Sequence, residues 1–530
     1  MTKRSKEAVL IFTRVPIAGE TKTRLMPFLS GKECASLHEG FIEQIYKTCQ
    51  TLQRDILVFY TPEDPKGILK RIFSPDQEMF VQEGQDLGEK MKQAFRQAFS
   101  MGYQSCILIG TDIPLITNRI LEDAFESLKE HELVIHPTKD GGYYLIGMKK
   151  EHDTIWKIPH YGTNTVIEDT LNKIKEDGID VYVGEKLQDV DTKEDLLEVV
   201  LSTEYIERYI KEKLHILEEK DIRLRILGQG EYNRNYSFVD PKNQKKMVLR
   251  INTGSQMHLE KQIEYEAHAL KLLEPTMRTP KVYFVDGSKK YFPYGILIME
   301  FLEGRPLDYR TDMMQAAKCL ADIHSLPIKE DSILLTPEDP FQAMIEECRE
   351  MADTYLFWDF GEDEVKMSIR RMLSFAENGI LKTGITQRHL INTELNSGNF
   401  LIQGPGKENY LIDWEKPILG EVEQDLAHFL APTTTFWKTD VILNRGEMEE
   451  FLAMYKEAVK GRFDVSGLKD RFPIYLMLTC LRGITWCSMA FVEYSTSDRV
   501  LRNDETFAKI KEYLQPGFLH KIEHEYFTTE

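Results

Sequence analysis

Hydrophobic positions in the first 200 residues occur in short, nearly continuous runs separated by amphipathic stretches. The runs are 7–14 (EAVLIFTR), 55–61 (DILVFYT), 105–112 (SCILIGTD) and 132–138 (ELVIHPT). Segments such as LGEKMKQAFRQAFSMG lie between them and have the apolar spacing of a helix. Strands that alternate with helices in this way are typical of an α/β domain with a mostly parallel sheet. We therefore predict such a domain over residues 1–200.

The pattern changes after residues 204–221 (EYIERYIKEKLHILEEKD), a charged stretch without Gly or Pro that predicts a helical connector. Beyond it, IRLRILGQGEYNRNYSFVD and KMVLRIN predict antiparallel strands around a glycine turn, followed by a helix and two more strands. The remainder is largely helical. A small β-rich lobe before a larger helical lobe is the layout of a kinase. We therefore expect a connector at 201–220 and a two-lobed, protein-kinase-like α+β domain at 221–530.

Length and charge limit the classes of function. The chain has 530 residues, more than one ordinary core contains, so two or more domains are expected. Its formal net charge of −19 disfavours nucleic acid as a partner, because nucleic-acid binding requires a basic face. The seven cysteines form no CxxC pair, and the N-terminus lacks the features of a signal peptide. We expect a cytoplasmic protein with reduced thiols that acts on small molecules, and its oligomeric state is left open.

One segment, 472–492 (FPIYLMLTCLRGITWCSMAFV), is nearly continuous apolar sequence around Arg482. An arginine at the centre of a membrane costs about 2.5–3.5 kcal/mol on insertion scales. No second spanning segment accompanies it in the sequence. We interpret the segment as a buried core helix and expect no membrane partner. We also expect Trp414, Trp437 and Trp486 to be core residues.

Basic residues follow the first predicted strand, in the loop RVPIAGETKTRL (14–25). The loop lacks the GxxxxGK[ST] pattern of a P-loop and the GxGxxG fingerprint of dinucleotide-binding folds. It does contain Arg14, Lys22 and Arg24 at the carboxyl end of a strand, where ligands bind in open α/β sheets. A solvated basic loop is the alternative. In an acidic protein, three cations at this place favour phosphate binding.

Aspartates follow other strands of the same domain. Asp112 comes directly after a buried strand, and Asp140 precedes two glycines that let backbone approach a ligand closely. Asp191 belongs to the later motif DVDTKEDL. Carboxylates opposite a phosphate loop suit a divalent metal, so Asp112 and Asp191 are candidate metal ligands and Asp140 a candidate nucleotide contact. A helix cap and a hairpin turn are the structural alternatives, and Thr192 with Asp195 forms a capping box.

Taken in order, RVPIAGETKTRL, GQDLGEKM, GTDIPLIT, PTKDGGYYLIG and DVDTKEDL resemble the GT-A-like nucleotide-sugar transferase superfamily. In particular they resemble the arsenosugar-biosynthesis-type glycosyltransferases, which are related to phospholactate guanylyltransferases. The resemblance implies a Rossmann-like GT-A fold. It also implies an NTP or nucleotide-sugar held by the basic loop, with Mg²⁺ or Mn²⁺ at the aspartates and Asp112 in catalysis. Nucleotidyl transfer and glycosyl transfer both remain open.

The second domain carries kinase motifs in kinase order. LGQGEYN places Gly228 and Gly230 on a strand and turn, and MVLR places Arg250 where kinases have a lysine. On the following helix Glu266, or alternatively Glu264, is the expected ion-pair partner of this cation. The backbone between Glu300 and Leu302, in ILIMEFLEG, fits the connection between the lobes that pairs with adenine.

The stretch INTELNSGNFLI and the later LIDWE complete the set. Glu394 and Asn399 have the D-x₄-N spacing of a kinase catalytic loop, with Glu in place of Asp, and Asp413 takes the place of the DFG aspartate. Asn399 and Asp413 are therefore candidate ligands of Mg²⁺ on the ATP phosphates, and Arg250 would neutralise those phosphates. Glu394 would orient or deprotonate the acceptor hydroxyl.

These motifs, with EYEAHALKLL, MEFLEGRPL and QDLAHFL, resemble the aminoglycoside phosphotransferase and choline kinase family, which uses ATP as phosphoryl donor. That family has His-Gly-Asp-Leu where this chain has Asn392-Thr393-Glu394-Leu395. A displacement of about 1 Å can cost about a hundredfold in rate. Glu nevertheless keeps the charge that positions a hydroxyl, which favours an active or retuned kinase.

We therefore expect a bifunctional transferase. Its kinase domain would phosphorylate a hydroxyl of a small metabolite, such as a sugar or amino alcohol. Its N-terminal domain would be a metal-dependent nucleotidyl- or glycosyltransferase. The alternative is a glycosyltransferase whose kinase-like module is catalytically impaired and binds a nucleotide or a partner.

Overall fold

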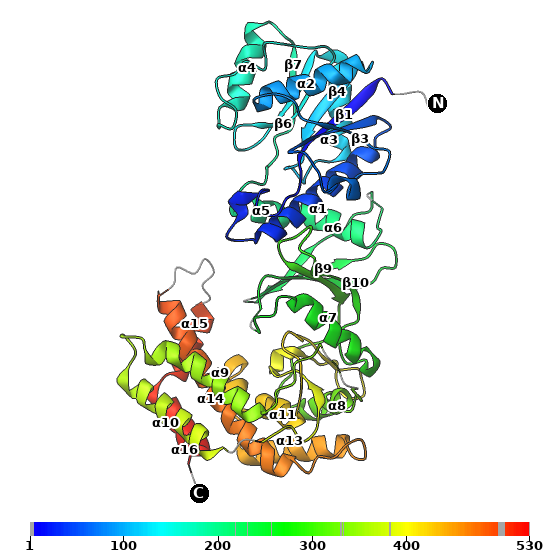
Figure 1. The fold of residues 1–530 in the computed structure, drawn as a ribbon. Helices are drawn as coiled ribbons and strands as arrows, with labels where there is room; N and C mark the ends of the chain where they lie inside the picture. Colours follow the sequence, from blue (N-terminus) through cyan, green and yellow to red (C-terminus); the bar gives the residue numbers. More distant parts are fainter. Residues whose placement is uncertain are drawn as a thin grey trace. The chain divides into compact units, whose positions relative to one another are not determined.

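The computed structural model describes residues 5–528 except 218, 231, 256, 329–330, 332, 381–382 and 497–503. The chain forms two compact units, labelled by element in Figure 1. The N-terminal unit is Met1–Leu227 with the short segments Phe238–Lys245 and Asp286–Ile296. The C-terminal unit comprises Gly228–Ser237, Lys246–Val285 and Leu297–Glu530.

The N-terminal unit is built on a seven-stranded sheet with the order β3-β2-β1-β4-β6-β5-β7. Its strands are β1 (Glu7–Arg14), β2 (Asp55–Thr61), β3 (Glu78–Val81), β4 (Ser105–Gly110), β5 (Leu133–Pro137), β6 (Tyr143–Met148) and β7 (Val181–Val183). All neighbouring pairs are parallel except those that β6 makes with β4 and β5. The predicted mostly parallel α/β sheet is confirmed.

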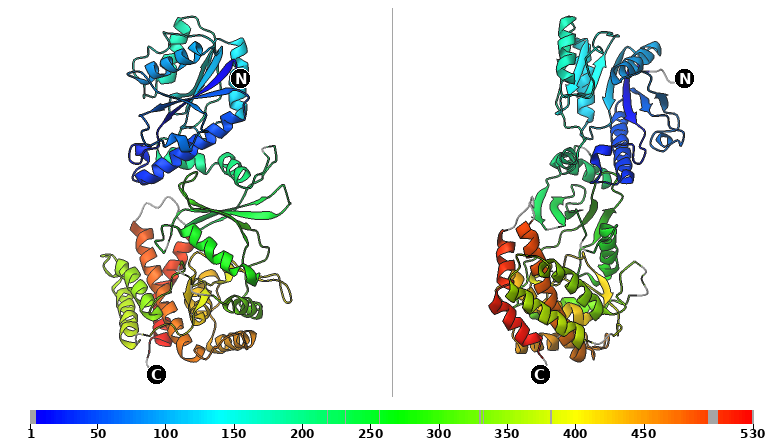
Figure 2. Two further views of the ribbon diagram at one scale, coloured as in Figure 1. Left: turned by 45° about the vertical axis from the view of Figure 1, so that its right-hand side comes forward. Right: turned by 60° about the vertical axis from the view of Figure 1, so that its left-hand side comes forward.

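Helices cover both faces of this sheet, as Figure 2 shows. Apolar side chains of α1 (Gly31–Gln50) and α3 (Asn118–Glu130) form one core with the sheet, and those of α2 (Leu87–Ser100) and α4 (Val166–Glu176) form a second. The alternating side chains of β1 supply both cores: Val9 and Ile11 pack in the first, Leu10 and Phe12 in the second. The loops that carry the site therefore start from strands that are held by packed helices on both faces of the sheet.

This unit differs from the predicted pattern in two unexpected strands and in the length of its last helix. Strands β3 and β6 were not expected; β6 follows the paired glycines, so that motif opens a strand of the central sheet. The charged helix α6 is Thr203–Lys213 and ends earlier than the expected connector. The predicted capping box at Thr192 and Asp195 is present at the start of α5 (Lys193–Val200).

The kinase-like part begins with a five-stranded sheet of order β11-β12-β10-β9-β8. The strands are β8 (Arg225–Gln229), β9 (Asn233–Val239), β10 (Lys246–Asn252), β11 (Val282–Asp286) and β12 (Gly295–Glu300), with helix α7 (Gln262–Leu273) between β10 and β11. This arrangement confirms the predicted small β-rich lobe.

The larger lobe is helical, with short strands at its motifs. Its helices are α8 (Met313–His324), α9 (Pro340–Leu356), α10 (Asp363–Gly379), α11 (Val422–Leu430), α12 (Pro432–Lys438), α13 (Arg445–Ala458), α14 (Leu468–Thr496), α15 (Asp504–Tyr513) and α16 (Pro516–Tyr526). The strands are β13 (His389–Ile391), β14 (Phe400–Leu401), β15 (Tyr410–Leu411) and β16 (Ile418–Gly420). The order of β-rich and helical lobes confirms the kinase-like fold class.

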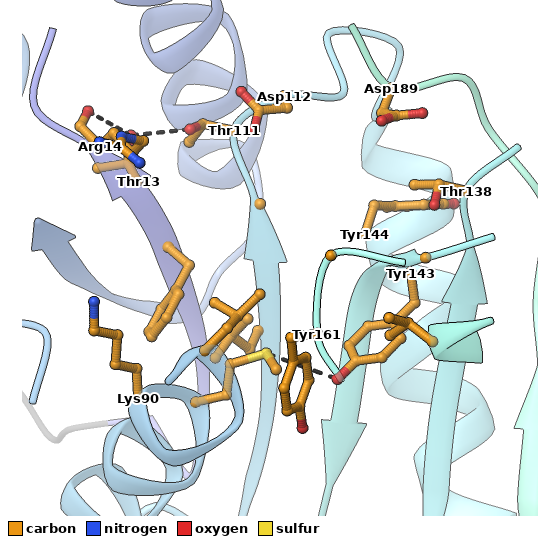
Figure 3. Close-up of a pocket in the computed structure, with 18 of the residues that line it drawn as sticks. Thr13, Arg14, Lys90, Thr111, Asp112, Thr138, Tyr143, Tyr144, Tyr161 and Asp189 are labelled. Carbon is orange, nitrogen blue, oxygen red and sulfur yellow. Dashed lines mark hydrogen bonds between the residues drawn. The ribbon is translucent and has the colours of Figure 1, made fainter. Parts of the chain in front are cut away.

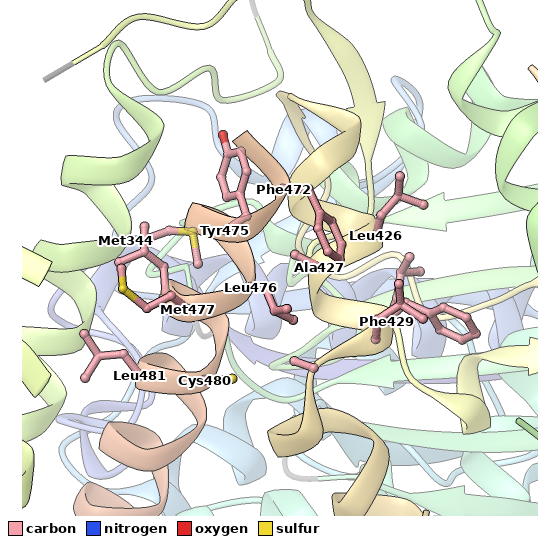
Figure 4. Close-up of a cluster of buried hydrophobic side chains, with 14 of the residues drawn as sticks. Met344, Leu426, Ala427, Phe429, Phe472, Tyr475, Leu476, Met477, Cys480 and Leu481 are labelled. Atoms are coloured by element: carbon pink, nitrogen blue, oxygen red, sulfur yellow. The ribbon is translucent and has the colours of Figure 1, made fainter. Parts of the chain in front are cut away.

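Helix α14 contains the apolar segment around Arg482. By length and apolarity it is the one helix in the described part of the chain that could cross a membrane, but 67% of its most apolar window is buried within the protein. Figure 4 shows Phe472 and Leu476 on the side of this helix that faces α11, and Met477 on the opposite side beside Met344 of α9. This packing supports the interpretation of α14 as a core helix. All seven cysteines are free and buried.

Candidate functional sites

A cavity of about 620 Å³ lies at the carboxyl ends of β1 and β4 in the N-terminal unit (Figure 3). It forms there because β1 and β4 are adjacent and parallel, so that the loops after both strands open on one edge of the sheet. The sequence-predicted residues that line it are Arg14, Arg24, Asp112, Asp140 and Asp191.

Lys22 is not among the lining residues and has a different environment from the one predicted. Its side chain is only 6% exposed, and Nζ lies 2.6 Å from Asp112 Oδ1 and 3.6 Å from Asp191 Oδ1. It also donates a hydrogen bond to the Val190 carbonyl at 2.5 Å. Burial raises the pKa of Asp112, but Lys22 and then His38 outweigh it and hold that pKa below its usual value. Lys22 therefore joins the two aspartates instead of extending toward a phosphate.

The same contacts bear on the predicted metal at the aspartates. Asp112 and Asp191 share the Lys22 ammonium, which occupies the position between their carboxylates. Among the described residues, no group of three or more His, Cys, Asp or Glu side chains could hold a metal ion. As arranged here, this pair of carboxylates does not fit a divalent metal, and no chemical step is assigned to one at this site.

Asp140 closes the glycine turn as well as lining the cavity. Its Oδ1 accepts hydrogen bonds from the Thr138 hydroxyl and from the Gly142 amide, the latter at 3.0 Å. Its neighbour Asp189 also lines the cavity, and burial together with the charge of Asp140 raises the pKa of Asp189 to about 6. Lys90 of α2 adds a third cation to the lining, which the sequence motifs did not identify.

In the C-terminal unit, the loop INTELNSGNF is held by a buried aspartate of α11. Asp425 accepts hydrogen bonds from the backbone amides of Asn392 and Thr393, at 2.9 and 2.7 Å. Thr393 adopts a positive φ of 70°. Asn399 Nδ2 then donates to the Glu394 carbonyl at 3.2 Å, which leaves Asn399 Oδ1 as an acceptor. The loop is thus fixed at both ends of the predicted spacing.

Arg250 of β10 forms the second charged cluster of this unit, with three carboxylates around its guanidinium. Its Nη1 lies 2.5 Å from Glu266 Oε1, 3.1 Å from Asp413 Oδ1 and 3.7 Å from Glu415 Oε1. Glu266, and not Glu264, is therefore its partner. Burial and the neighbouring Asp413 raise the pKa of Glu415 to about 9.

Asp413 and Asn399 offer a divalent metal one carboxylate and one amide oxygen; the acidic side chains here, like those elsewhere in the described chain, form no three-residue group arranged to hold a metal by themselves. Three carboxylates share one arginine, and Glu266 Oε2 is buried without a hydrogen-bond partner. The surplus negative charge would be relieved by a cation, and carboxylate and amide oxygens are the ligands that Mg²⁺ prefers. Asp413 and Asn399 Oδ1 are the groups that would hold it.

Glu394 lies between two cations that were not part of the predicted site. Its Oε1 is 2.9 Å from Lys416 Nζ and 3.3 Å from Arg482 Nη2. Burial raises the pKa of Glu394, but Lys416 and Arg482 outweigh it and lower that pKa to about 2. Arg482 also binds Glu347 of α9, with Nε 3.0 Å from Oε2.

Two cavities adjoin this cluster. One of about 470 Å³ is lined by Glu347, Lys416 and Arg482, and one of about 210 Å³ by Glu394 and again Arg482. Trp437 and Trp486 line the smaller cavity; they are partly buried and pack against the hydrophobic core at its margin, where core positions were predicted. Trp414 is 1% exposed, as predicted.

The remaining predicted residues lie in the β-rich lobe. The Gly230 amide donates to the Asn233 carbonyl at 2.9 Å and closes the glycine turn, and a side chain at Gly228 would meet no atom within 4 Å. The Glu300 amide donates to the Lys281 carbonyl at 2.8 Å. Adenine recognition would therefore use the Glu300 carbonyl and the backbone near Leu302.

Comparison with known proteins divides the chain in the same way. Residues 44–163 match a family described as an uncharacterized protein conserved in bacteria (DUF2064), and residues 223–464 match the phosphotransferase enzyme family. The 2-phospho-L-lactate guanylyltransferase of Methanocaldococcus jannaschii is 29% identical over 195 residues, 36% of this chain and 82% of the relative. The protein is a two-domain transferase.

Two solved structures are similar to its two parts. A putative nucleotide-diphospho-sugar transferase from Desulfovibrio desulfuricans G20 has 28% identity, a TM-score of 0.36, and coverage of 40% of this chain and 96% of its own. The spectinomycin phosphotransferase APH(9)-Ia has 16% identity, a TM-score of 0.43, and coverage of 60% and 98%. The relationships of the N-terminal domain to phospholactate guanylyltransferases and of the C-terminal domain to the phosphotransferase family agree with the resemblances in the sequence motifs.

Sequence analysis of this transferase missed Lys90, Glu415, Lys416 and the role of Arg482. Only Arg482 had a visible signal, a lone charge within 21 mostly apolar residues at 472–492. Lys416 follows the LIDWE motif by one residue and could not be distinguished from a solvated lysine.

Proposed function

We propose that the protein is a bifunctional transferase. Its C-terminal domain, for which we retain the limits 221–530, phosphorylates a hydroxyl group of a small metabolite with ATP. Its N-terminal domain then transfers a nucleotidyl group from an NTP to the phosphate so formed. The observation that carries the proposal is the contact of Arg250 with Asp413 inside a surplus of carboxylates. Asn399 is joined to the same segment, because the amide of Ile412 donates to the Asn399 carbonyl at 2.8 Å. The buried, free cysteines are consistent with action in the cytoplasm.

In the kinase domain, Arg250 neutralises negative charge at the ATP phosphates while Glu266 fixes its guanidinium. Mg²⁺, held by Asn399 and Asp413, would supply further neutralisation of those phosphates. Glu394 orients the acceptor hydroxyl and receives its proton. Because charge and position matter more than strong basicity when phosphoryl transfer is loose, a glutamate can serve here.

In the N-terminal domain, Arg14, Arg24 and Lys90 of the cavity lining face the negative charge of a triphosphate. The new phosphomonoester attacks the α-phosphorus of the NTP, a P–O bond forms, and pyrophosphate leaves. The similarity to a 2-phospho-L-lactate guanylyltransferase supports a phosphorylated acceptor and favours GTP among the NTPs.

A second candidate is a glycosyltransferase with an impaired kinase-like module. The ion pairs of Glu394 with Lys416 and Arg482 favour it, because they make this carboxylate a weaker base.

Phosphorus NMR of the full-length protein separates the two candidates. We would supply Mg-ATP with GTP, CTP or UTP, a set of nucleotide-sugars and a pool of hydroxylated metabolites. The proposal predicts a new phosphomonoester resonance, followed by pyrophosphate and a phosphodiester resonance. Consumption of nucleotide-sugars with untouched NTPs would instead support the glycosyltransferase.

A further inference from the structure

We propose that the acceptor of the kinase domain is a small hydroxycarboxylate whose carboxylate is bound by Lys416 and Arg482. The inference rests on the kinase activity proposed above and adds the chemical class of its substrate. It comes from two buried cations that stand beside Glu394 and that no kinase motif requires.

The two cations are fixed where an acceptor must enter. Arg482, on α14, lines both cavities next to Glu394, and Lys416 lines the larger one. Their side chains are 16% and 14% exposed, so a ligand that contacts them is largely removed from water. Glu347 holds the Arg482 Nε and leaves the remainder of the guanidinium directed at Glu394. Charge-assisted hydrogen bonds are strongest in such a setting.

The charge balance of the cavities favours an anionic acceptor. Their charged groups are Glu347, Glu394, Lys416 and Arg482. When Glu394 binds the substrate hydroxyl, Lys416 and Arg482 are balanced only by Glu347, and one positive charge is left without a partner. The whole chain, by contrast, has a net charge of −19. A polyamine would gain no unpaired carboxylate here and would approach two buried cations, which is unfavourable.

The position of the Glu394 carboxylate shows that a carboxylate can contact both cations at once. One of its oxygens, Oε1, contacts Lys416 Nζ at 2.9 Å and Arg482 Nη2 at 3.3 Å. A substrate carboxylate that takes over these contacts releases Glu394 to accept a hydrogen bond from the hydroxyl of the same substrate. A neutral acceptor leaves Glu394 paired with both cations. The site therefore selects acceptors that carry a carboxylate and a hydroxyl close together.

The larger cavity sets the size of the acceptor. Its volume of about 470 Å³ and its apolar lining at Met257, Leu335 and Met344 suit a short aliphatic chain. In the reaction, the substrate hydroxyl oxygen bonds to the γ-phosphorus, the bond from that phosphorus to the bridging β,γ-oxygen breaks, and ADP leaves. The hydroxyl proton passes to Glu394 and then to water. The product is a phosphomonoester beside a carboxylate.

Matched acceptors test the proposal in the full-length protein. ADP formation from Mg-ATP would be measured with lactate, glycerate and malate, with lactamide as the neutral isostere, and with ethanolamine and glucose. We expect turnover with at least one hydroxycarboxylate and at least about tenfold lower kcat/KM for lactamide than for lactate. Turnover of ethanolamine or glucose without any hydroxycarboxylate would overturn the acceptor class and leave the kinase activity standing. ADP formation with none of these acceptors would overturn both.

Variants then locate the carboxylate site. Removing Arg482 alone would leave Glu347 unpaired, so we would compare Glu347→Gln with Glu347→Gln/Arg482→Gln, and separately make Lys416→Gln. Loss of either cation should raise the KM for the hydroxycarboxylate roughly ten- to a hundredfold, the effect of losing a charge-assisted hydrogen bond, with KM for ATP unchanged. Arg370→Gln, at an exposed position of α10, is the matched control and should change neither value. Equal changes in both KM values, or an undiminished preference for lactate over lactamide, would overturn the assignment.

Discussion

Lys22 Nζ lies 2.6 Å from Asp112 Oδ1 and 3.6 Å from Asp191 Oδ1, so a lysine occupies the place between two carboxylates where a metal was expected. The contact is buried on the lysine side and is supported by the hydrogen bond from the Val190 amide to the Asp112 carbonyl, at 3.0 Å. The site therefore carries its own cation before any nucleotide binds.

Replacing this lysine should create a metal site. In Lys22→Met the two carboxylates lose their shared cation, and their mutual repulsion would be relieved by Mn²⁺. We expect Mn²⁺ to bind the variant at least about tenfold more tightly, equivalent to about 1.4 kcal/mol, by isothermal titration calorimetry. The parent protein, Lys22→Met and the control would all carry Asp413→Asn, so that Mn²⁺ cannot bind at the kinase site. Lys32→Met, at an exposed position of α1, is the control, and equal Mn²⁺ affinity in all three proteins would contradict the expectation.

Gly141 is the residue of the paired-glycine motif that cannot carry a side chain. It has a φ of +96°, and a Cβ there would collide with the backbone of Asn164. Gly141→Ala should therefore cost both the left-handed conformation, about 1–2 kcal/mol, and overpacking, about 1–3 kcal/mol. Gly102→Ala isolates the first term, because Gly102 has a φ of +99° and no atom within 4 Å of its would-be Cβ.

Urea unfolding of both glycine variants measures the difference. We expect a larger loss of unfolding free energy for Gly141→Ala than for Gly102→Ala, and a loss of nucleotide binding only in the former. Equal losses would show that Asn164 yields to the new methyl group.

The strands that carry the sites were predictable because their environment is uniform. Both faces of β1 and β4 are covered, so each is an uninterrupted apolar run, and the predicted limits 7–14 agree with β1. Strand β6 was missed although its sequence YYLIGM is aromatic and apolar, because Asp140 and the two glycines before it were interpreted only as a turn or a ligand contact. Because β1 and β4 were both predicted, the sequence alone placed the candidate site correctly, at the edge of the sheet where the carboxyl ends of these strands lie.

Side-chain partners were harder to predict than elements. Lys22 and Arg24 are two positions apart and looked equivalent, yet Lys22 is 6% exposed and Arg24 72% exposed. Which of them turns inward depends on the distant Asp112 and Asp191, and no local pattern records that contact. Arg482 could be identified only as a charge that its apolar helix would not tolerate without a partner.

Arg250 is expected to be essential for stability as well as for turnover. Arg250→Met leaves Glu266, Asp413 and Glu415 without their shared cation, and breaking a buried ion pair in this way costs about 3–5 kcal/mol. Thermal unfolding of Arg250→Met/Glu266→Gln should recover part of this loss, because one buried negative charge is removed. ADP formation should stay low in both variants. A double variant no more stable than Arg250→Met would contradict the assigned pairing.

His136 should make the N-terminal unit less stable in mild acid. Burial lowers the pKa of His136 to about 4, from an ordinary value of 6.5, so the unfolded chain binds this proton first as the pH falls. The neutral form is favoured in the folded state, and the unfolding free energy should decrease from pH 6.5 to about 4, by at most about 3 kcal/mol. His136→Phe should reduce this pH dependence because it removes the titrating imidazole. Tyr144 keeps its hydrogen bond to the Glu185 carbonyl at 3.1 Å in the variant, so its hydroxyl still has a partner. Urea unfolding at pH 7.5 and 5 measures it, with the exposed His160→Phe as control, and an unchanged pH dependence in His136→Phe would show that other groups cause it.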